Sequence, residues 1–196
     1  MSATMPAHRD IAWEWRDRAG LEHLTLAADG TEIRAEGLVV LALDGSAVRL
    51  HHTTVHDARW RFREAHLAME RGAERREVRI VRAENGAWTI DGVARPDLAG
   101  CTGIDIMATP FTNTPAILEK PLPPDGSRIL HVAFVRLPDL AVAPVEQEYT
   151  RLDPASPPHL FRYTNRKSGF TAELTVDDDG IVVDYPGYWR LRGGGR

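Results

Sequence analysis

The first hundred residues alternate apolar and polar side chains with a period of two, which is typical of β-strands with one buried face. Four Asp-Gly or Asn-Gly pairs separate these segments, at residues 29–30, 44–45, 85–86 and 91–92, and such pairs favour tight hairpin turns. Gly37 lies inside one segment and predicts a bulge or bend there. The predicted strands of this antiparallel meander are Ala12–Trp15, Leu21–Ala27, Thr31–Leu43, Ser46–Val55, Asp57–Glu70, Glu77–Ala83 and Ala87–Ile90.

The segment Asp57–Glu70 is ambiguous between helix and strand. Leu67 and Met69 fit either, but Trp60 alternates with arginines at 59, 61 and 63, and this period of two favours a strand. We therefore predict a strand with three guanidinium groups on one face. That face is either an anion site for a phosphate or carboxylate, or a solvated surface balanced by acids on neighbouring strands.

The chain after residue 122 repeats the strand pattern. We expect a crossing over Pro138–Pro144, a proline-rich loop over Asp153–Pro158, a loose leader over Met1–Asp10 and a frayed glycine tail at 193–195. No linker divides the chain, so one domain over residues 1–196 is predicted, built from two similar meanders. The predicted strands here are Ile129–Val135, Val145–Leu152, Leu160–Thr164, Phe170–Val176 and Ile181–Tyr185.

The segment Gly100–Leu122 differs from everything around it. It carries the only cysteine, an acid within an apolar run, and two Thr-Pro pairs. Thr109-Pro110 predicts a helix start, because a threonine hydroxyl caps free N–H groups and proline suits the first helical position. Thr114-Pro115 repeats the signal one turn later, which predicts a short or kinked helix. We expect one apolar helix around which the strands of a mainly β fold wrap.

Composition narrows the functional classes. With 196 residues and a net charge of −4, the chain needs no disulfide to fold, and its acidic balance argues against nucleic-acid binding. The single cysteine favours a reducing compartment. The first fifteen residues lack the layout of a secretion signal, and no apolar run reaches membrane-spanning length. A soluble cytoplasmic protein without integral membrane association is expected.

The histidines at 51, 52 and 56 invite a metal interpretation that strand geometry disfavours. His51 and His52 point to opposite faces of a strand, and His52 lies about 13 Å from His56 at ~3.3 Å per residue. A zinc ion would need a further segment to join them. Cys101 lacks a nearby histidine, and neither a nucleophile elbow nor a phosphate loop is present. We therefore expect no metal, no cofactor and no catalytic residue.

Asp105 is the most distinctive candidate for a functional residue. Ile104 and Ile106 flank it, which predicts that its carboxylate is buried. A buried carboxylate needs hydrogen bonds or a positive partner. It either has a structural role, with backbone groups or an arginine such as Arg61 as its partner, or it meets a ligand. Threonine and asparagine side chains nearby, at positions 109, 112 and 113, carry the same two interpretations.

Several motifs together resemble a bacterial family known as the putative glycolipid-binding proteins. The distinctive one is ATPFTNT over residues 108–114, and the likeness runs in the same order along nearly the whole chain. The other matching pieces are Val55-His56-Asp57, Trp60-Arg61-Xaa-Arg63, Pro96-Asp97-Leu98-Ala99-Gly100-Cys101, Ile104-Asp105-Ile106, Val135-Xaa-Xaa-Pro138-Xaa-Leu140, Gln147-Xaa-Tyr149 and residues 176–187 with Asp184-Tyr185-Pro186-Gly187.

This resemblance implies a spiral β-roll, a long antiparallel meander sheet around a single central helix, with a likeness in shape to periplasmic lipoprotein carriers. It implies an amphipathic lipid or glycolipid as ligand, bound between sheet and helix. The polar contacts would come from Asp105, Arg61, Thr109, Thr112, Asn113 and Tyr149, and the apolar ones from Trp60, Phe111, Ile106, Ile117 and Leu118.

Two alternatives stay open at this point. One is an enzyme that uses Asp105 as an acid or base in a related pocket. The other is a ligand-free interaction module whose core is filled by its own side chains and which acts as a homodimer. A cavity of about 300 Å³ or more would separate a ligand-binding protein from the filled module.

Overall fold

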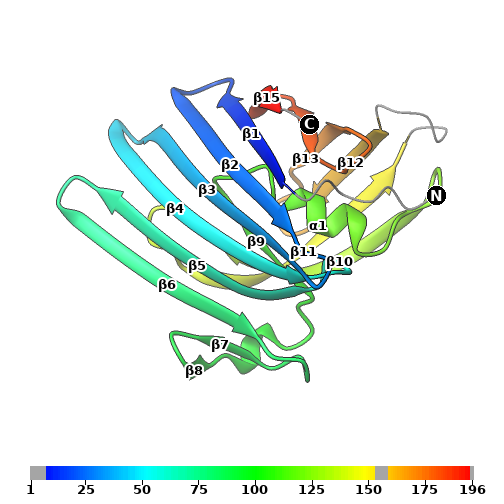
Figure 1. The fold of residues 1–196 in the computed structure, drawn as a ribbon, viewed down its shortest axis with the longest axis horizontal. Coiled ribbons are helices and arrows are strands. Elements are labelled where there is room, and N and C mark those ends of the chain that lie inside the picture. Colours follow the sequence, from blue (N-terminus) through cyan, green and yellow to red (C-terminus); the bar gives the residue numbers. More distant parts are fainter. Residues whose placement is uncertain (1–7, 153–158, 195–196) are drawn as a thin grey trace.

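The computed structural model describes residues 8–152 and 159–194, which form one sheet of 15 strands with a single α-helix, α1 (Asn113–Leu118) (Figure 1). A short 3-10 helix covers Pro96–Leu98. The strands are β1 (His8–Trp15), β2 (Gly20–Ala28), β3 (Glu32–Leu43), β4 (Ser46–Asp57), β5 (Phe62–Arg71), β6 (Glu74–Arg82), β7 (Trp88–Ile90), β8 (Val93–Ala94), β9 (Gly103–Ile106), β10 (Ser127–Val135), β11 (Val142–Arg151), β12 (His159–Asn165), β13 (Thr171–Val176), β14 (Val182–Tyr185) and β15 (Trp189–Gly194).

The mainly β class and the antiparallel meanders are confirmed. Strands β8 to β1 form one meander and β15 to β10 form the other. The two are joined by antiparallel pairing of β1 with β15, so the two ends of the described chain meet in the middle of the sheet. Strand β9 adds to β10 in parallel, which leaves β8 and β9 as the two edges of an open sheet.

The strands alternate buried and exposed side chains, as their sequence pattern predicts. The buried faces build one large apolar cluster, which includes Trp13, Leu50 and Phe62, and a smaller one around Tyr163 and Leu174. Figure 1 places α1 between the N-terminal strands and the strands of the C-terminal half. Within the larger cluster, Phe111 ahead of the helix contacts the rings of His56 and Trp60.

The helix begins later than Thr109-Pro110 predicts. The Thr109 hydroxyl accepts a hydrogen bond from the Phe111 backbone N–H at 3.0 Å, which stabilises a turn ahead of the helix. The first helical residue is Asn113, and Pro115 lies inside the first turn, where its missing N–H costs no helical hydrogen bond. The two threonine–proline pairs thus mark a turn and a helix start rather than two helix starts.

Gly37 marks a close approach and not the predicted bulge. It pairs with His52 in an unbroken register between β3 and β4. A Cβ atom at position 37 would lie 2.1 Å from His52 Nε2, so any side chain there would overlap the imidazole. Only glycine leaves room for the ring to lie across β3.

The predicted strand Asp57–Glu70 is wrong at residues 58–61, which form a turn and its flank. Strand β4 extends to Asp57, and β5 begins only at Phe62 after a turn. The β4–β5 register shifts between Val55 and His56, and Trp60 takes a positive φ of 64°. The three arginines at 59, 61 and 63 therefore do not share one strand face.

Three further predictions are wrong at the ends of elements. Gly193 and Gly194 belong to β15, where Gly193 pairs with Ala12, so they are no frayed tail. The predicted crossing stops at Ala141, because β11 begins at Val142. The last three residues of the predicted leader, 8–10, are part of β1. Residues 1–7, 195 and the predicted loop 153–158 lie outside the described residues.

Candidate functional site

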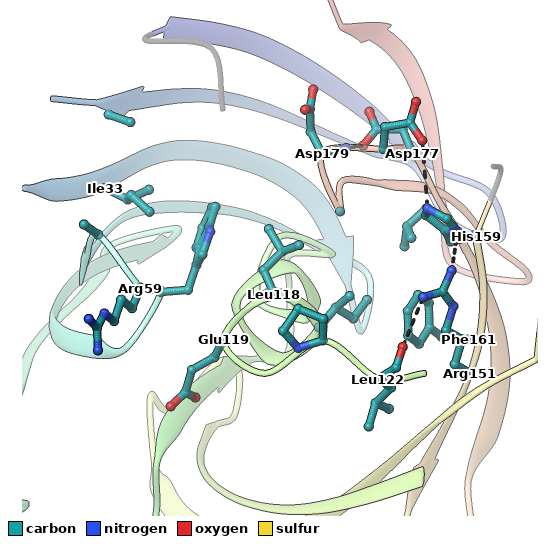
Figure 2. Close-up of a pocket in the computed structure, with 18 of the residues that line it drawn as sticks. Ile33, Arg59, Leu118, Glu119, Leu122, Arg151, His159, Phe161, Asp177 and Asp179 are labelled. Atoms are coloured by element: carbon teal, nitrogen blue, oxygen red, sulfur yellow. Dashed lines mark hydrogen bonds and ion pairs between the residues drawn. The ribbon is translucent and has the colours of Figure 1, made fainter. Parts of the chain in front are cut away.

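A cavity of about 990 Å³ opens at one end of the sheet, where three turns meet the C-terminal end of α1 (Figure 2). The turns join β2 to β3, β4 to β5 and β13 to β14. We call this space the large cavity. Its walls are formed by residues 28, 30, 32, 33, 58–60, 117–119, 121, 122, 151, 159, 161 and 176–180.

Apolar side chains supply the middle of the large cavity. Figure 2 shows Leu118 of α1 between Ile33 of β3 and Phe161 of β12. Thr114 donates a hydrogen bond to the Gly180 carbonyl at 2.8 Å, which ties α1 to the β13–β14 turn. A Cβ atom on Gly180 would lie 2.9 Å from Leu118, so glycine is needed for this contact. The helix is thereby held where its Leu118 side chain reaches the cavity.

The β13–β14 turn brings three consecutive acids to the wall. Arg9 of β1 is buried and bridges two of them, with Nη2 2.7 Å from Asp177 Oδ2 and Nη1 3.0 Å from Asp179 Oδ2. Asp177 also accepts backbone hydrogen bonds from residues 179 and 181. Two acids are thus used in shaping the turn, whereas the Asp178 side chain is 53% exposed.

Arg151 and His159 extend this polar wall. Arg151 donates to the Leu122 carbonyl at 3.0 Å, and its Nη2 lies 3.0 Å from His159 Nδ1. His159 Nε2 lies 3.9 Å from Asp178 Oδ1. Figure 2 shows Arg59 and Glu119 on the opposite side of Leu118. The large cavity therefore has an apolar middle with charged groups of both signs on two sides.

The turn before β5 places Trp60 in this cavity wall. Asp57 Oδ1 accepts hydrogen bonds from the backbone N–H groups of Arg59 and Arg61, at 2.9 and 3.0 Å. Asp57 Oδ2 accepts from Arg61 Nε at 2.8 Å. Partial burial raises the pKa of Asp57, but these hydrogen bonds outweigh it and hold the pKa below its ordinary value. Asp57 thus fixes the turn that presents Trp60.

A second cavity of about 20 Å³ lies on the other side of α1, and we call it the small cavity. Trp60 and Glu119 border both cavities. The remaining walls of the small cavity come from β4, β5, the segment around β9, the helix and β10, through residues 56, 62, 102–104, 112, 115, 116, 130 and 132. The Trp60 indole therefore lies between a wide space and a narrow one.

Asp105 is held by side chains beneath the start of the helix. Its Oδ1 accepts from the Thr112 hydroxyl at 2.9 Å, and its Oδ2 accepts from Gln147 Nε2 at 2.5 Å. Burial raises its pKa, while these two hydrogen bonds oppose the rise. Asn113 accepts a hydrogen bond from the Tyr149 hydroxyl at 2.8 Å. These polar groups tie the segment 105–113 to β11.

The structure brings together part of the predicted ligand site. Asp105, Thr112, Asn113 and Tyr149 form the network under the helix, but among the described residues none of them lines the large cavity. Of the eight predicted site residues, only Trp60 does. The other three are placed elsewhere, with Thr109 in the turn before α1, Phe111 fully buried in the core, and Arg61 paired with Asp57 outside the cavity.

The charged residues of the polar wall were not predicted from the sequence. Arg151 and His159 stand at the ends of β11 and β12, and no local pattern distinguishes them from surface residues. The run Asp177-Asp178-Asp179 carried a signal, because three adjacent acids next to a glycine turn require a partner or solvent. Its partner, Arg9, is 168 residues away in the chain, beyond the reach of any motif.

The histidines do not gather into a metal site. His52 is buried with its Nε2 2.8 Å from Glu22 Oε1, whereas His51 is exposed. Within residues 8–152 and 159–194, no three side chains of the His, Cys, Asp and Glu types lie close enough to share a metal ion. The same residues contain no helix long and apolar enough to span a membrane.

The fold places the chain among mainly β proteins built on one large open sheet. It has the same fold as a β-barrel-like protein with a domain of unknown function (DUF1849) from Brucella abortus, at a TM-score of 0.56, 10% identity and coverage of 95% of this chain and 96% of that one. A crystal structure of a DUF1089 family protein from Pseudomonas aeruginosa matches at a TM-score of 0.77 and 31% identity, over 87% of this chain and 91% of that one.

The chain belongs to the family described as "Putative glycolipid-binding", whose model matches residues 10–191. This confirms the resemblance seen in the sequence motifs. No curated protein matches the chain.

Proposed function

We propose that the protein binds an amphipathic lipid or glycolipid in the large cavity, without catalysis. The observation that carries this proposal is a space of about 990 Å³ with an apolar middle and charged walls. Ligand cavities range over about 300–1,000 Å³ and combine mostly apolar walls with a few placed polar groups. An acyl chain fits between Ile33, Leu118 and Phe161, and a polar head group fits near Asp178 and His159.

The ligand site that we propose differs from the one that the sequence predicts. Trp60 and Leu118 keep their predicted apolar role, whereas Asp105 and its neighbours stand apart from the large cavity. Their hydrogen bonds support a structural role for Asp105, because both carboxylate oxygens already accept from side chains of this chain. The enzyme alternative loses its main residue on this evidence, and the volume of the cavity favours binding over a filled module.

We further propose that the sheet is a spiral β-roll around α1 and that residues 1–196 form one domain. The β1–β15 pairing supports this, because it makes the two meanders continuous. Contacts of the helix segment on both sides also support it: the Phe111 ring lies 6.3 Å from the His56 ring, and Thr114 bonds to Gly180. A cytoplasmic location, the absence of nucleic-acid binding and the homodimer alternative stay predictions.

Titration with amphipathic probes tests the proposal. Saturated fatty acids and alkyl glucosides, each below its micelle concentration, are titrated into the protein and followed by calorimetry. The variant Ala58→Trp places a large side chain at the cavity wall, and Ala94→Trp is the matched control, because it changes an exposed alanine outside both cavities. We expect wild type and Ala94→Trp to bind and Ala58→Trp to lose at least ten-fold in affinity, about 1.4 kcal/mol. Equal binding by all three, or none by wild type, contradicts the proposal.

A further inference from the structure

Among the described residues that line the large cavity, Trp60 is the one in which three features occur together. Its backbone has a positive φ of 64°, the residue is 9% exposed, and it borders both cavities as a large aromatic group. A bulky residue with positive φ is a conformational outlier that costs on the order of 1–3 kcal/mol. The fold therefore accepts backbone strain at the place where this indole separates two spaces.

The surroundings of Trp60 hold the indole in place. Its ring centre lies 5.9 Å from that of His56 and 6.4 Å from that of Phe111. The Trp60 carbonyl lies 3.3 Å from His56 Nδ1, and its backbone N–H donates to the Asp57 carbonyl at 2.9 Å. The turn and two aromatic neighbours thus fix the indole against the helix segment.

The helix completes the separation. Ile117 and Leu118 face the large cavity, whereas Pro115 and Ala116 line the small one. The small cavity, at about 20 Å³, has room for one water molecule but not for an acyl chain. Its walls combine apolar side chains, among them Ile104, Leu130 and Val132, with a few polar ones such as Thr102 and Thr112. Removal of the indole would join this recess to the large cavity.

We infer that Trp60 determines ligand specificity by ending the acyl-chain channel, so that it sets the longest chain that the large cavity accommodates. This inference rests on the proposed function, because it concerns the same site. An acyl chain that enters between Ile33 and Leu118 meets the indole, and further methylene groups stay in solvent. Each methylene that is buried instead increases affinity about four-fold.

The test compares chain-length profiles of wild type and Trp60 variants. Fatty acids and alkyl glucosides that differ by two carbons are titrated into wild type, Trp60→Ala and Trp60→Gly. Glycine adopts a positive φ without strain, so in Trp60→Gly the relief of backbone strain offsets part of the stability that is lost with the packing of the indole. The control Ile33→Ala changes a large-cavity residue that does not border the small cavity.

In wild type, affinity is expected to rise about four-fold per methylene up to a limiting length and then level off. In both Trp60 variants the limit moves to longer chains by at least two carbons, whereas Ile33→Ala weakens binding at every length without moving the limit. Adding Leu130→Phe to Trp60→Gly narrows the recess and moves the limit part of the way back toward the wild-type length.

The two proposals fail in different ways. If the limiting chain length is unchanged in both Trp60 variants, or if wild type shows no limiting length, the proposed role of Trp60 is overturned while the proposed lipid binding stands. Absence of binding to either probe series by wild type overturns the proposed function and the role of Trp60 with it.

Discussion

Replacement of Gly37 by alanine is expected to destabilise the protein strongly, although alanine is the smallest change available. The new Cβ atom would lie 2.1 Å from His52 Nε2 and 2.5 Å from its Cε1. The imidazole is fully buried, and its Nε2 is hydrogen-bonded to the fully buried Glu22 side chain at 2.8 Å. The ring must therefore move, and its hydrogen bond to Glu22 is lost.

The magnitude follows from three contributions. Overpacking of a filled core costs about 1–3 kcal/mol. A buried carboxyl group left without its partner costs about 1–3 kcal/mol more. Replacement of a strand glycine by alanine returns roughly 0.5–1 kcal/mol. The net loss in the free energy of unfolding is about 3 kcal/mol, which lowers Tm by roughly 6–12 °C for a protein of this size.

Chemical denaturation of single and double variants isolates the cause. Gly103→Ala is the matched control, because no atom lies within 4 Å of its Cβ position and its φ is not positive. We expect it to cause no loss of stability and a gain of at most about 1 kcal/mol. In a His52→Ala background the imidazole is absent, so Gly37→Ala should cost nothing further there. Two results would refute the reasoning. One is an equal loss of unfolding free energy on Gly37→Ala in the wild-type and His52→Ala backgrounds, and the other is a loss for Gly37→Ala no larger than for Gly103→Ala.

Two predictions concern acid groups and are read from stability measured against pH. Because burial raises the pKa of folded Asp105, its ionised form destabilises the fold as pH rises above the unfolded value of about 3.9. The stability of Asp105→Asn relative to wild type should therefore increase as pH rises above about 4, by about 1.4 kcal/mol for each ten-fold weakening of the acid on folding, and a pH-independent difference would contradict this. Asp57→Ala removes three hydrogen bonds and should cost roughly 2 kcal/mol at pH 7. Because the pKa of folded Asp57 is lowered, this stabilisation is lost as pH falls below about 3.9, and a deficit that persists in acid would count against it.

Local sequence patterns predict most of the strands because the period of two and the Asp-Gly turns are properties of neighbouring residues. Strand β3 and its turn to β4 follow directly from this pattern. The pairing of β1 with β15 does not, because its partners, such as Trp15 and Trp189, are far apart in sequence. Strand β9 was missed for the same reason, since it depends on a parallel partner, β10, beyond the helix.

Of the eight residues that the sequence predicts as a ligand site, Trp60 alone lines the large cavity in the described part of the chain. Residues such as Thr112 and Asn113 stand out in the sequence because they are polar within an apolar segment, and that same property serves their structural hydrogen bonds. The large cavity forms where the ends of distant strands meet, so its polar wall, with Arg151 and His159, leaves no motif. Trp60 stands out in the sequence among three arginines, but its position in a turn follows from the hydrogen bonds of Asp57.

Native mass spectrometry of the purified protein, followed by lipid extraction, is the decisive test of lipid binding in the large cavity. We expect a non-covalent adduct in the lipid mass range on wild type and Ala94→Trp, and its loss from Ala58→Trp, in which the wall of the large cavity is altered. The extracted lipid would then identify the head group that meets Asp178 and His159. A wild-type protein that carries no adduct and takes up neither fatty acids nor alkyl glucosides would contradict the account.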